Sequence, residues 1–245
     1  SGAKHVLYNL FQVLVDNDDE VLIPSPYWVS YPEQVKIAGG KPVILEGLQE
    51  SGFKISKKQI ETAITNRTKI LVLNYPANPT GITYNRQELE GFAEVALKNN
   101  LVIITDEIYD KILYKDEKHT SFPQLGSDVK EKTILVNGVS KTYSMTGWRI
   151  GYAAGNSEVI SAMNNLSGQS TSNPTSISQK AAIEAFRGPQ DAVQNMLKEF
   201  KERRDYITSA LNEINGIDCV LPEGAFYVFP NISSYFGKEH KGKKI

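Results

Sequence analysis

Apolar and polar residues alternate along this chain in two distinct patterns. Short apolar runs rich in β-branched residues predict buried strands, and these runs span residues 20–24, 42–45, 69–73, 101–105 and 133–136. Apolar residues at helical spacing predict helices over residues 6–15, 85–99 and 158–166. Strands that alternate with helices are typical of an α/β fold, so we expect a mostly parallel central sheet flanked by helices.

Residues at the ends of the predicted helices support this division. Asn85, three residues before Glu88, predicts a helix start of the capping-box kind, and Asn99 with Asn100 predicts its end. Residues 190–215 read as one long, charged amphipathic helix, which Gly216 breaks.

After this long helix the pattern changes. Residues 219–230 predict a loop and a strand that begin a second, smaller domain. Residues 238–244 are polar and basic, which predicts a frayed or truncated end. We therefore expect a large domain over residues 1–189, and a connecting helix with the start of a small α/β domain over residues 190–245.

Composition narrows the kinds of partner. The 245 residues are 40% hydrophobic and carry a formal net charge of −1, which argues against disorder and against binding nucleic acid or a membrane by charge. A small molecule or another subunit is expected instead. The single cysteine, Cys219, allows no intrachain disulfide and favours a reducing, cytoplasmic location. The start at Ser1 without an initiating Met indicates an excised or processed piece.

Polar side chains follow three of the predicted strands. Asp106 ends the fourth run with Tyr109 three positions later, Asn78 lies between two prolines after the third, and Lys141 and Arg149 follow the fifth. Ligands of open α/β sheets bind outside the carboxyl ends of the strands, so these groups are expected to converge on one crevice. A buried amine and a buried guanidinium there would need an anionic partner.

Several motifs in order along the chain resemble one family. They are Ser25-Pro26-Tyr27-Trp28, Asn78-Pro79-Thr80-Gly81, Asp106-Glu107-Ile108-Tyr109, the run 138–151 around Lys141, Ser172-Asn173-Pro174 and Gly224-Ala225-Phe226-Tyr227. Over nearly the whole chain this combination resembles class I aminotransferases, and bacterial-type aspartate aminotransferases in particular. The resemblance implies the large domain of a fold-type-I transferase that depends on pyridoxal 5'-phosphate (PLP).

The resemblance also implies roles for the strand-end residues. Lys141 would hold PLP as a Schiff base and then act as general acid and base. Asp106 would pair with the protonated pyridine nitrogen, so that the ring can accept electrons. Asn78 and Tyr109 would hydrogen-bond the ring's phenolic oxygen and keep it anionic.

Further residues are implied at the ring face and at the phosphate. Trp28 would stack on the ring, and Arg149 would bind the phosphate through its planar fork. Gly2, Ala3 and Lys4 open a helix whose N-terminus suits the same phosphate. Trp28, Asn78 and Lys4 would also contact the substrate, and a cation at Lys4 favours an acidic one.

The implied reaction is transamination between an amino acid and a 2-oxo acid, with aspartate and 2-oxoglutarate as the expected pair, in a homodimer. An aromatic, alanine or prephenate aminotransferase is the alternative within the class. The family's arginine for the substrate α-carboxylate and its N-terminal arm are not in this chain. Cofactor binding is therefore better supported by the sequence than turnover.

Other classes of protein lack support in the sequence. There is no Gly-x-Gly-x-x-Gly turn, Walker phosphate loop or His-Glu-x-x-His motif. His5, His119 and His240 have no spacing typical of a metal site or a catalytic triad, so we expect surface or helix-face positions and no metal. A non-catalytic sensor module with the PLP fold is the alternative outside enzymes.

Overall fold

The computed structural model describes residues 1–115 and 118–244. Its helices are α1 (Gly2–Leu14), α2 (Ser30–Ile37), α3 (Lys57–Ala63), α4 (Arg86–Lys98), α5 (Ser127–Lys132), α6 (Ser157–Gly168), α7 (Ser176–Arg187) and α8 (Asp191–Asn212). The strands of the main sheet are β1 (Glu20–Ser25), β2 (Lys41–Glu46), β3 (Thr68–Asn74), β4 (Val102–Asp106), β5 (Thr133–Gly138) and β6 (Gly151–Ala154). Four strands of two residues follow: β7 (Asp218–Cys219), β8 (Pro230–Asn231), β9 (Glu239–His240) and β10 (Lys243–Lys244).

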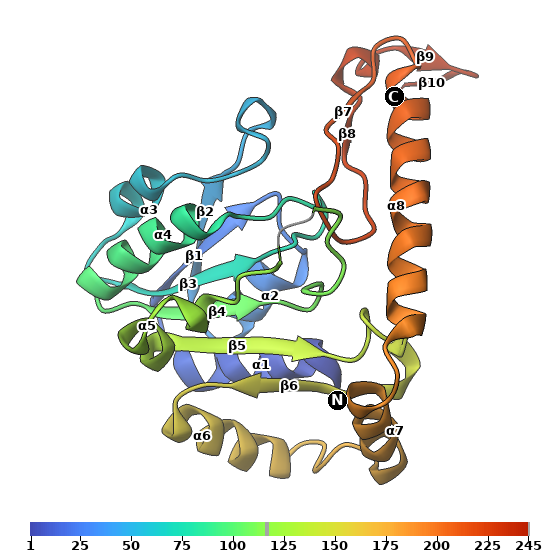
Figure 1. Cartoon of the computed structure of the whole chain (residues 1–245). Coiled ribbons are helices and arrows are strands. Elements are labelled where there is room, and N and C mark those ends of the chain that lie inside the picture. Colours follow the sequence, from blue (N-terminus) through green and yellow to red (C-terminus); the bar gives the residue numbers. More distant parts are fainter. Residues whose placement is uncertain (116–117, 245) are drawn as a thin grey trace.

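The main sheet has the order β2-β1-β3-β4-β5-β6. All neighbouring pairs are parallel except β5 with β6, which is antiparallel. The predicted α/β fold with a mostly parallel sheet is therefore confirmed. β3, β4 and β5 lie side by side with their carboxyl ends at the same edge, so the loops that follow them meet there (Figure 1).

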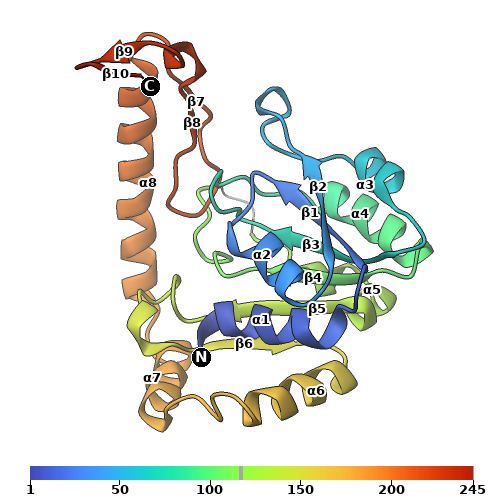
Figure 2. The same cartoon turned by 180° about the vertical axis from the view of Figure 1, so that it is seen from behind.

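Helices cover both faces of this sheet (Figures 1 and 2). Side chains alternate along a strand, so Leu71 and Leu73 of β3 pack with α4 on one face, while Ile70 and Val72 pack with α1 and α2 on the other. Each such side chain contributes roughly 1.5–3 kcal/mol when it leaves water. Burial on both faces explains why these strands appear as continuous apolar runs in the sequence.

The predicted ends of α4 are confirmed. The Asn85 side chain accepts a hydrogen bond from Glu88 N at 2.9 Å, and Asn85 N donates to Glu88 Oε2 at 2.6 Å, which completes the capping box. Asn99 is the C-cap, and Asn100 takes the left-handed conformation with φ of 54°. The predicted long helix is α8, which stands apart from the sheet (Figure 1).

Two expectations for the last part of the chain are wrong. Between β7 and β8 no strand forms in the described structure apart from one bridge of Gly224 to Leu113, because the backbone of this loop bonds to the large sheet's own loops instead. The segment 238–244 is paired rather than frayed: β9 and β10 form an antiparallel hairpin around a turn with two positive φ angles.

Candidate active site

A cavity of about 270 Å3 opens at the carboxyl ends of β3, β4 and β5. It is lined by Ala3, Lys4, Leu7, Trp28, Tyr31, Asn74, Asn78, Asp106, Ile108, Tyr109, Ser140, Lys141, Thr146, Arg149 and Tyr227. Every residue that the sequence analysis assigned to a site is in this set except Gly2, which lies next to it against Arg149. The structure thus brings together residues from the first to the last third of the chain.

Asp106, the last residue of β4, lies at the buried end of the cavity. Its Oδ2 accepts a hydrogen bond from the Tyr31 hydroxyl at 2.7 Å, and its Oδ1 accepts from Ile108 N at 3.3 Å. Burial raises the pKa of this carboxyl to about 6, although both hydrogen bonds act in the opposite direction. A carboxylate that is costly to keep charged in this way is suited to pair with a cation.

Sequence reasoning missed Tyr31. Its side chain is 2% exposed, and the ring lies edge-to-face against Trp28 with centroids 5.2 Å apart. The available signal was its place three residues after Trp28, in the first turn of α2. Tyr31 is the side chain that holds Asp106 in place.

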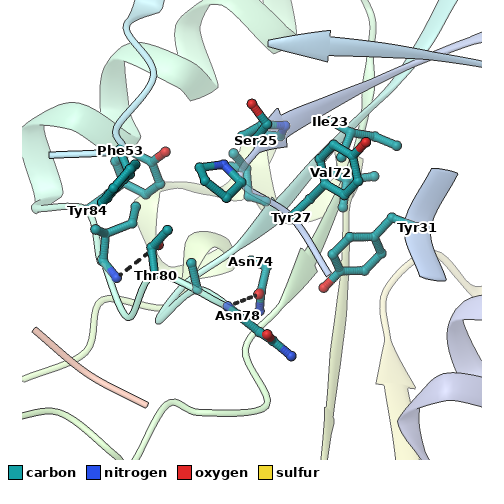
Figure 3. Close-up of a pocket in the computed structure, with 15 residues that line it drawn as sticks. Ile23, Ser25, Tyr27, Tyr31, Phe53, Val72, Asn74, Asn78, Thr80 and Tyr84 are labelled. Carbon is teal, nitrogen blue, oxygen red and sulfur yellow. Dashed lines mark hydrogen bonds between the residues drawn. The ribbon is translucent and has the colours of Figure 1, made fainter. Parts of the chain in front are cut away.

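Asn74 and Asn78 connect the β3 loop to Asp106. Asn74 Nδ2 donates to the Asp106 carbonyl at 2.9 Å, and its Oδ1 accepts from Asn78 N at 2.8 Å, the bond drawn between them in Figure 3. Both residues and Tyr31 also border a second, smaller cavity of about 20 Å3, where Tyr27 lies (Figure 3). The Asn78 backbone is thereby held at the boundary of the two cavities.

Two tyrosine hydroxyls meet on the side of the cavity near Asn78. The Tyr109 and Tyr227 oxygens are 2.5 Å apart, and Asn78 Nδ2 donates to the Tyr227 oxygen at 3.4 Å. Burial, and then the bond to Tyr227, hold the pKa of Tyr109 well above its usual range, so its hydroxyl keeps its proton. Tyr227 had no role in the sequence analysis, although its motif was recognised.

Lys141 and Arg149 were expected to be buried, and this expectation is wrong. Lys141 is partly buried and Arg149 is exposed, because the loop after β5 carries both to the open mouth of the cavity. Burial, and then the nearby charge of Arg149, lower the pKa of Lys141, whereas Asp106 acts to raise it. An amine with a lowered pKa reaches its neutral, nucleophilic form more readily.

The start of α1 packs closely against the loop that carries Arg149. A Cβ placed on Gly2 would lie 2.4 Å from Arg149 Nη2, and one on Gly151 would lie 2.3 Å from Ala3 N. Only glycine fits at either position. The guanidinium and the free N–H groups of the first turn of α1 therefore lie side by side, which is a suitable arrangement for a phosphate.

Lys4 and Trp28 lie together on the cavity wall. Lys4 Nζ is 4.8 Å from the centroid of the Trp28 ring, within the range of a cation–π contact. The Lys4 side chain is exposed at the mouth, whereas Trp28 is partly buried. This places an aromatic plane and an exposed cation at the entrance.

The expectation of a surface or helix-face position is wrong for His119. Its side chain is 10% exposed, and Nε2 lies 2.8 Å from the buried Glu107 carboxylate. The ring stacks on Tyr75 at 5.1 Å between centroids. The pair supports the turn directly after Asp106 but does not line the cavity. His5 lies on α1 as expected.

The polar groups that line the cavity match the polar groups of PLP. A buried carboxylate suits the pyridine nitrogen, a guanidinium beside a helix N-terminus suits the phosphate, and a primary amine lies on the same cavity wall. The hydroxyl and amide donors of Tyr109 and Asn78 suit an anionic ring oxygen. Each polar group of that cofactor thus has a chemically matched group on the cavity.

Comparison with known proteins agrees with this geometry. Residues 1–243 match the family described as aminotransferase class I and II, and the chain belongs to that family. It is 56% identical over 231 residues to the aspartate aminotransferase of Bacillus subtilis (strain 168), covering 94% of this chain and 59% of that protein. It is 47% identical to the aspartate/prephenate aminotransferase of Cereibacter sphaeroides, covering 99% of this chain and 61% of that protein.

Solved structures confirm the fold. The aspartate aminotransferase from Rhizobium meliloti superposes with a TM-score of 0.95 at 43% identity, covering 100% of this chain and 62% of that one. The chain thus spans about three fifths of the length of the relatives it matches. Among the described residues, no helix is both long enough and apolar enough to cross a membrane.

Proposed function

We propose that this chain is the PLP-binding part of an aspartate aminotransferase, which moves an amino group between aspartate and 2-oxoglutarate. The observation that carries the proposal is the single cavity on which Asp106, Lys141 and Arg149 meet. The relatives named above support the reaction class, since their names describe aminotransferases.

When bound, PLP supplies an electron sink for the carbanion that forms at the substrate Cα. Lys141 would hold the cofactor covalently and, as a free amine, move the proton at Cα. Its lowered pKa favours the neutral amine that both roles require. Asp106 would hold a proton on the pyridine nitrogen, where a cationic partner replaces the water that the buried carboxylate has lost.

Other residues of the cavity would bind and orient the cofactor. Arg149 and the first N–H groups of α1, at Gly2 and Ala3, would hold the phosphate. Trp28 would cover one ring face. Tyr109 and Asn78 would donate to the ring's phenolic oxygen, and each has a donor on the cavity side for that purpose.

Lys4 supports an acidic substrate. Its ammonium group at the cavity mouth can reach a second carboxylate, and the similar Thermus thermophilus aspartate aminotransferase was solved with maleate, a dicarboxylate. An aspartate/prephenate specificity is the second candidate, favoured by relatives of that name at 46–47% identity. Trp28 and Asn78 would contact either substrate.

Three wider features are also proposals. The division into a PLP-binding domain over residues 1–189 and a partial second domain from residue 190 rests on α8 standing apart from the sheet (Figure 2). A homodimer is supported by exposed apolar side chains, such as Val29 and Ile177, each 73% exposed. A cytoplasmic location rests on the single cysteine.

The test is a titration of the chain with PLP, followed by amino-group transfer from aspartate to 2-oxoglutarate in the protein extended to the length of its relatives. We expect a visible absorption band, and transfer from aspartate faster than from phenylalanine. Lys4→Gln should lower kcat/KM for aspartate while leaving that for phenylalanine nearly unchanged. Absence of the absorption band would contradict PLP binding. An equal loss of kcat/KM for aspartate and phenylalanine would contradict the role of Lys4.

A further inference from the structure

The amine of Lys141 lies in a corner between two aromatic rings. Its Nζ lies over the Phe226 ring, 5.5 Å from the centroid, and over the Tyr109 ring, 5.9 Å from the centroid. The two rings pack edge-to-face, with centroids 5.5 Å apart and an interplanar angle of 82°. Both distances to the amine are within the roughly 6 Å over which a ring face attracts an ammonium group. Tyr109 already has a role at the site, whereas the sequence analysis assigned none to Phe226.

Helix α8 supports both sides of this contact. The Phe226 ring packs on Phe200 of α8, with centroids 5.4 Å apart. Ser144 follows Lys141 in the same loop, and its N–H donates to the Lys141 carbonyl at 3.2 Å while its hydroxyl donates to Met196 Sδ at 3.0 Å. Met196 and Phe200 are four residues apart on α8, so they lie on one face of the helix. The aromatic ring and the loop that carries the amine therefore rest on the same helical face.

The backbone next to Phe226 is anchored to the turn that carries Tyr109. Ala225 N donates to Ile112 O at 2.9 Å, and the Tyr114 hydroxyl donates to the Ala225 carbonyl. Phe226 is 39% exposed, yet its ring is fixed by these bonds and by Phe200. The ring is thus held in position beside the amine from the loop and from α8.

Other charges also act on the amine. The titratable and charged side chains that line the cavity with Lys141 are Lys4, Tyr31, Asp106, Tyr109, Arg149 and Tyr227. Beyond Phe226, Arg203 and Arg204 of α8 line a second cavity of about 570 Å3. Burial, and then Arg149, lower the pKa of Lys141, and Asp106 acts to raise it. Replacing Phe226 changes none of these charges, so the effect of its ring can be measured against a constant background.

We propose that Phe226 is a positioning residue for Lys141, whose ring attracts the ammonium form of the amine and holds it beside Tyr109 on the cavity wall. The use of the held amine rests on the proposed function, in which Lys141 takes up the proton at Cα and is then an ammonium group. Attraction by the ring favours that charged form, whereas burial and Arg149 disfavour it. Phe226 therefore steadies the lysine while it carries the proton.

A ring that only covered the amine would have the opposite effect on its pKa. Apolar cover removes water from an ammonium group and lowers its pKa, whereas a ring face stabilises the ammonium group and raises its pKa. Phe226→Leu keeps an apolar side chain and removes the aromatic ring. The direction in which the pKa of Lys141 moves in this variant therefore separates the two roles.

The experiment titrates the PLP-free chain, labelled with 13C-lysine, and follows the 13Cε NMR signal of Lys141, which is assigned by its absence in Lys141→Ala. Phe226→Leu should lower the pH midpoint of this signal by about half a pH unit. Phe226→Tyr keeps the ring and should leave the midpoint nearly unchanged. Phe229→Leu is the matched control, because Phe229 lies in the same loop, is 38% exposed and packs edge-to-face on Phe53 instead.

A second readout uses the wild-type chain. Ring faces shield the nuclei above them, so the ε-methylene protons of Lys141 should resonate upfield of those of exposed lysines, and this shift should diminish in Phe226→Leu. An ordinary resonance position in the wild type, or an unchanged or raised midpoint in Phe226→Leu, would overturn the inference. PLP is absent from both measurements, so titration of the wild-type chain with PLP tests the proposed function separately. The expected midpoints without an absorption band on adding PLP would overturn the proposed function and leave the contact of Phe226 with the amine in place.

Discussion

At the scale of single residues, the site consists of groups that are unfavourable in isolation and complementary to one ligand. Asp106 is buried without a cation among the described residues that bond to it, and Lys141 shares the cavity mouth with the like charge of Arg149. A ligand with a cationic ring would compensate the buried carboxylate of Asp106, and its phosphate would compensate the like charges of Lys141 and Arg149. Such perturbed groups are characteristic of functional sites.

Asp106→Asn should therefore stabilise the cofactor-free chain at neutral pH. The pKa of the carboxyl rises from 3.8 to about 6 in the folded protein, so its contribution to stability is present below about pH 4 and is lost as the pH rises through 6. The variant avoids this loss, and its free energy of unfolding at pH 7.5 should exceed that of the wild type by up to about 3 kcal/mol. Urea unfolding at pH 4 and pH 7.5 measures the difference, which should vanish at pH 4.

Asp18→Asn is the control for this prediction, because Asp18 has an exposed side chain and the same chemical change there occurs in water. If the gain in unfolding free energy at pH 7.5 persists at pH 4, or if the control shows the same gain, burial of the Asp106 charge is not the cause of the gain. In the PLP-loaded protein the same substitution should be harmful, since a neutral amide cannot hold the ring nitrogen protonated.

Arg149→Lys should weaken PLP binding about 10- to 100-fold, because a planar fork of donors is replaced by one point charge. A Cβ on Gly2 would lie 2.4 Å from Arg149 Nη2, so α1 comes close to the guanidinium. Titration of the PLP-free chain gives the dissociation constants. Arg67→Lys, a change on the exposed surface, should leave the affinity unaltered. Equal affinity for Arg149→Lys would mean that α1 holds the phosphate without the guanidinium.

At the scale of elements, the loop between β7 and β8 connects the last part of the chain to the active site. Glu223 N and Gly224 N both donate to the Gly81 carbonyl, at 3.0 and 2.8 Å. A Cβ on Gly81 would lie 2.6 Å from the Gly224 oxygen and from Pro222 Cβ. The close approach of these two loops is what brings Tyr227 to Tyr109.

Gly81→Ala should separate the two loops and displace Tyr227. Gly52→Ala is a matched control, since the two glycines have φ of 69° and 63°, but no atom lies within 4 Å of a Cβ at Gly52. Both variants bear the strain of a positive φ, about 1 kcal/mol. Any additional loss of unfolding free energy in Gly81→Ala therefore measures the effect of the close approach of the two loops. We expect lower PLP affinity for Gly81→Ala alone. Similar unfolding energies and affinities in both variants would contradict the role of this contact.

The elements differ in how far the sequence could predict them. Strands β1 to β5 of the main sheet and the ends of α4 follow from local signals, namely apolar runs and the Asn85–Glu88 capping box, whereas β6 was not predicted. The loop at 220–229 reads as a strand because Phe226, Val228 and Phe229 favour one. Its backbone groups instead bond to Gly81 and Ile112, which are remote in sequence and outside any local pattern.

In the candidate site, too, local motifs predicted some residues, whereas partners remote in sequence were not predicted. The motifs placed Lys141, Asp106 and Asn78 correctly on the cavity, because each follows a strand of a parallel sheet. The partners that orient them, Tyr31 and Tyr227, could not be assigned, since a tyrosine in a motif does not reveal which hydroxyl it will meet. The exposure of Arg149 was also missed, because a charged side chain at a cavity mouth and one at its base have the same sequence neighbours.

At the scale of the whole molecule, the cavity uses residues from α1, from the strand-end loops and from the loop before β8. It is assembled from both proposed parts of the chain, although the chain spans only about three fifths of the length of its relatives. Among the residues that line the cavity in the described structure, Arg149 is the one arginine, and it is assigned to the phosphate. The cavity residues that match PLP lead us to expect cofactor binding by this chain.

Borohydride reduction tests whether PLP is attached covalently to Lys141. The PLP-loaded chain is reduced, digested and mapped by mass spectrometry. We expect one modified peptide that contains Lys141, no modification in Lys141→Ala, and unchanged labelling of Lys141 in Lys4→Gln. Labelling of Lys4 or another lysine instead of Lys141, or persistence of the label in Lys141→Ala, would show that Lys141 does not hold the cofactor.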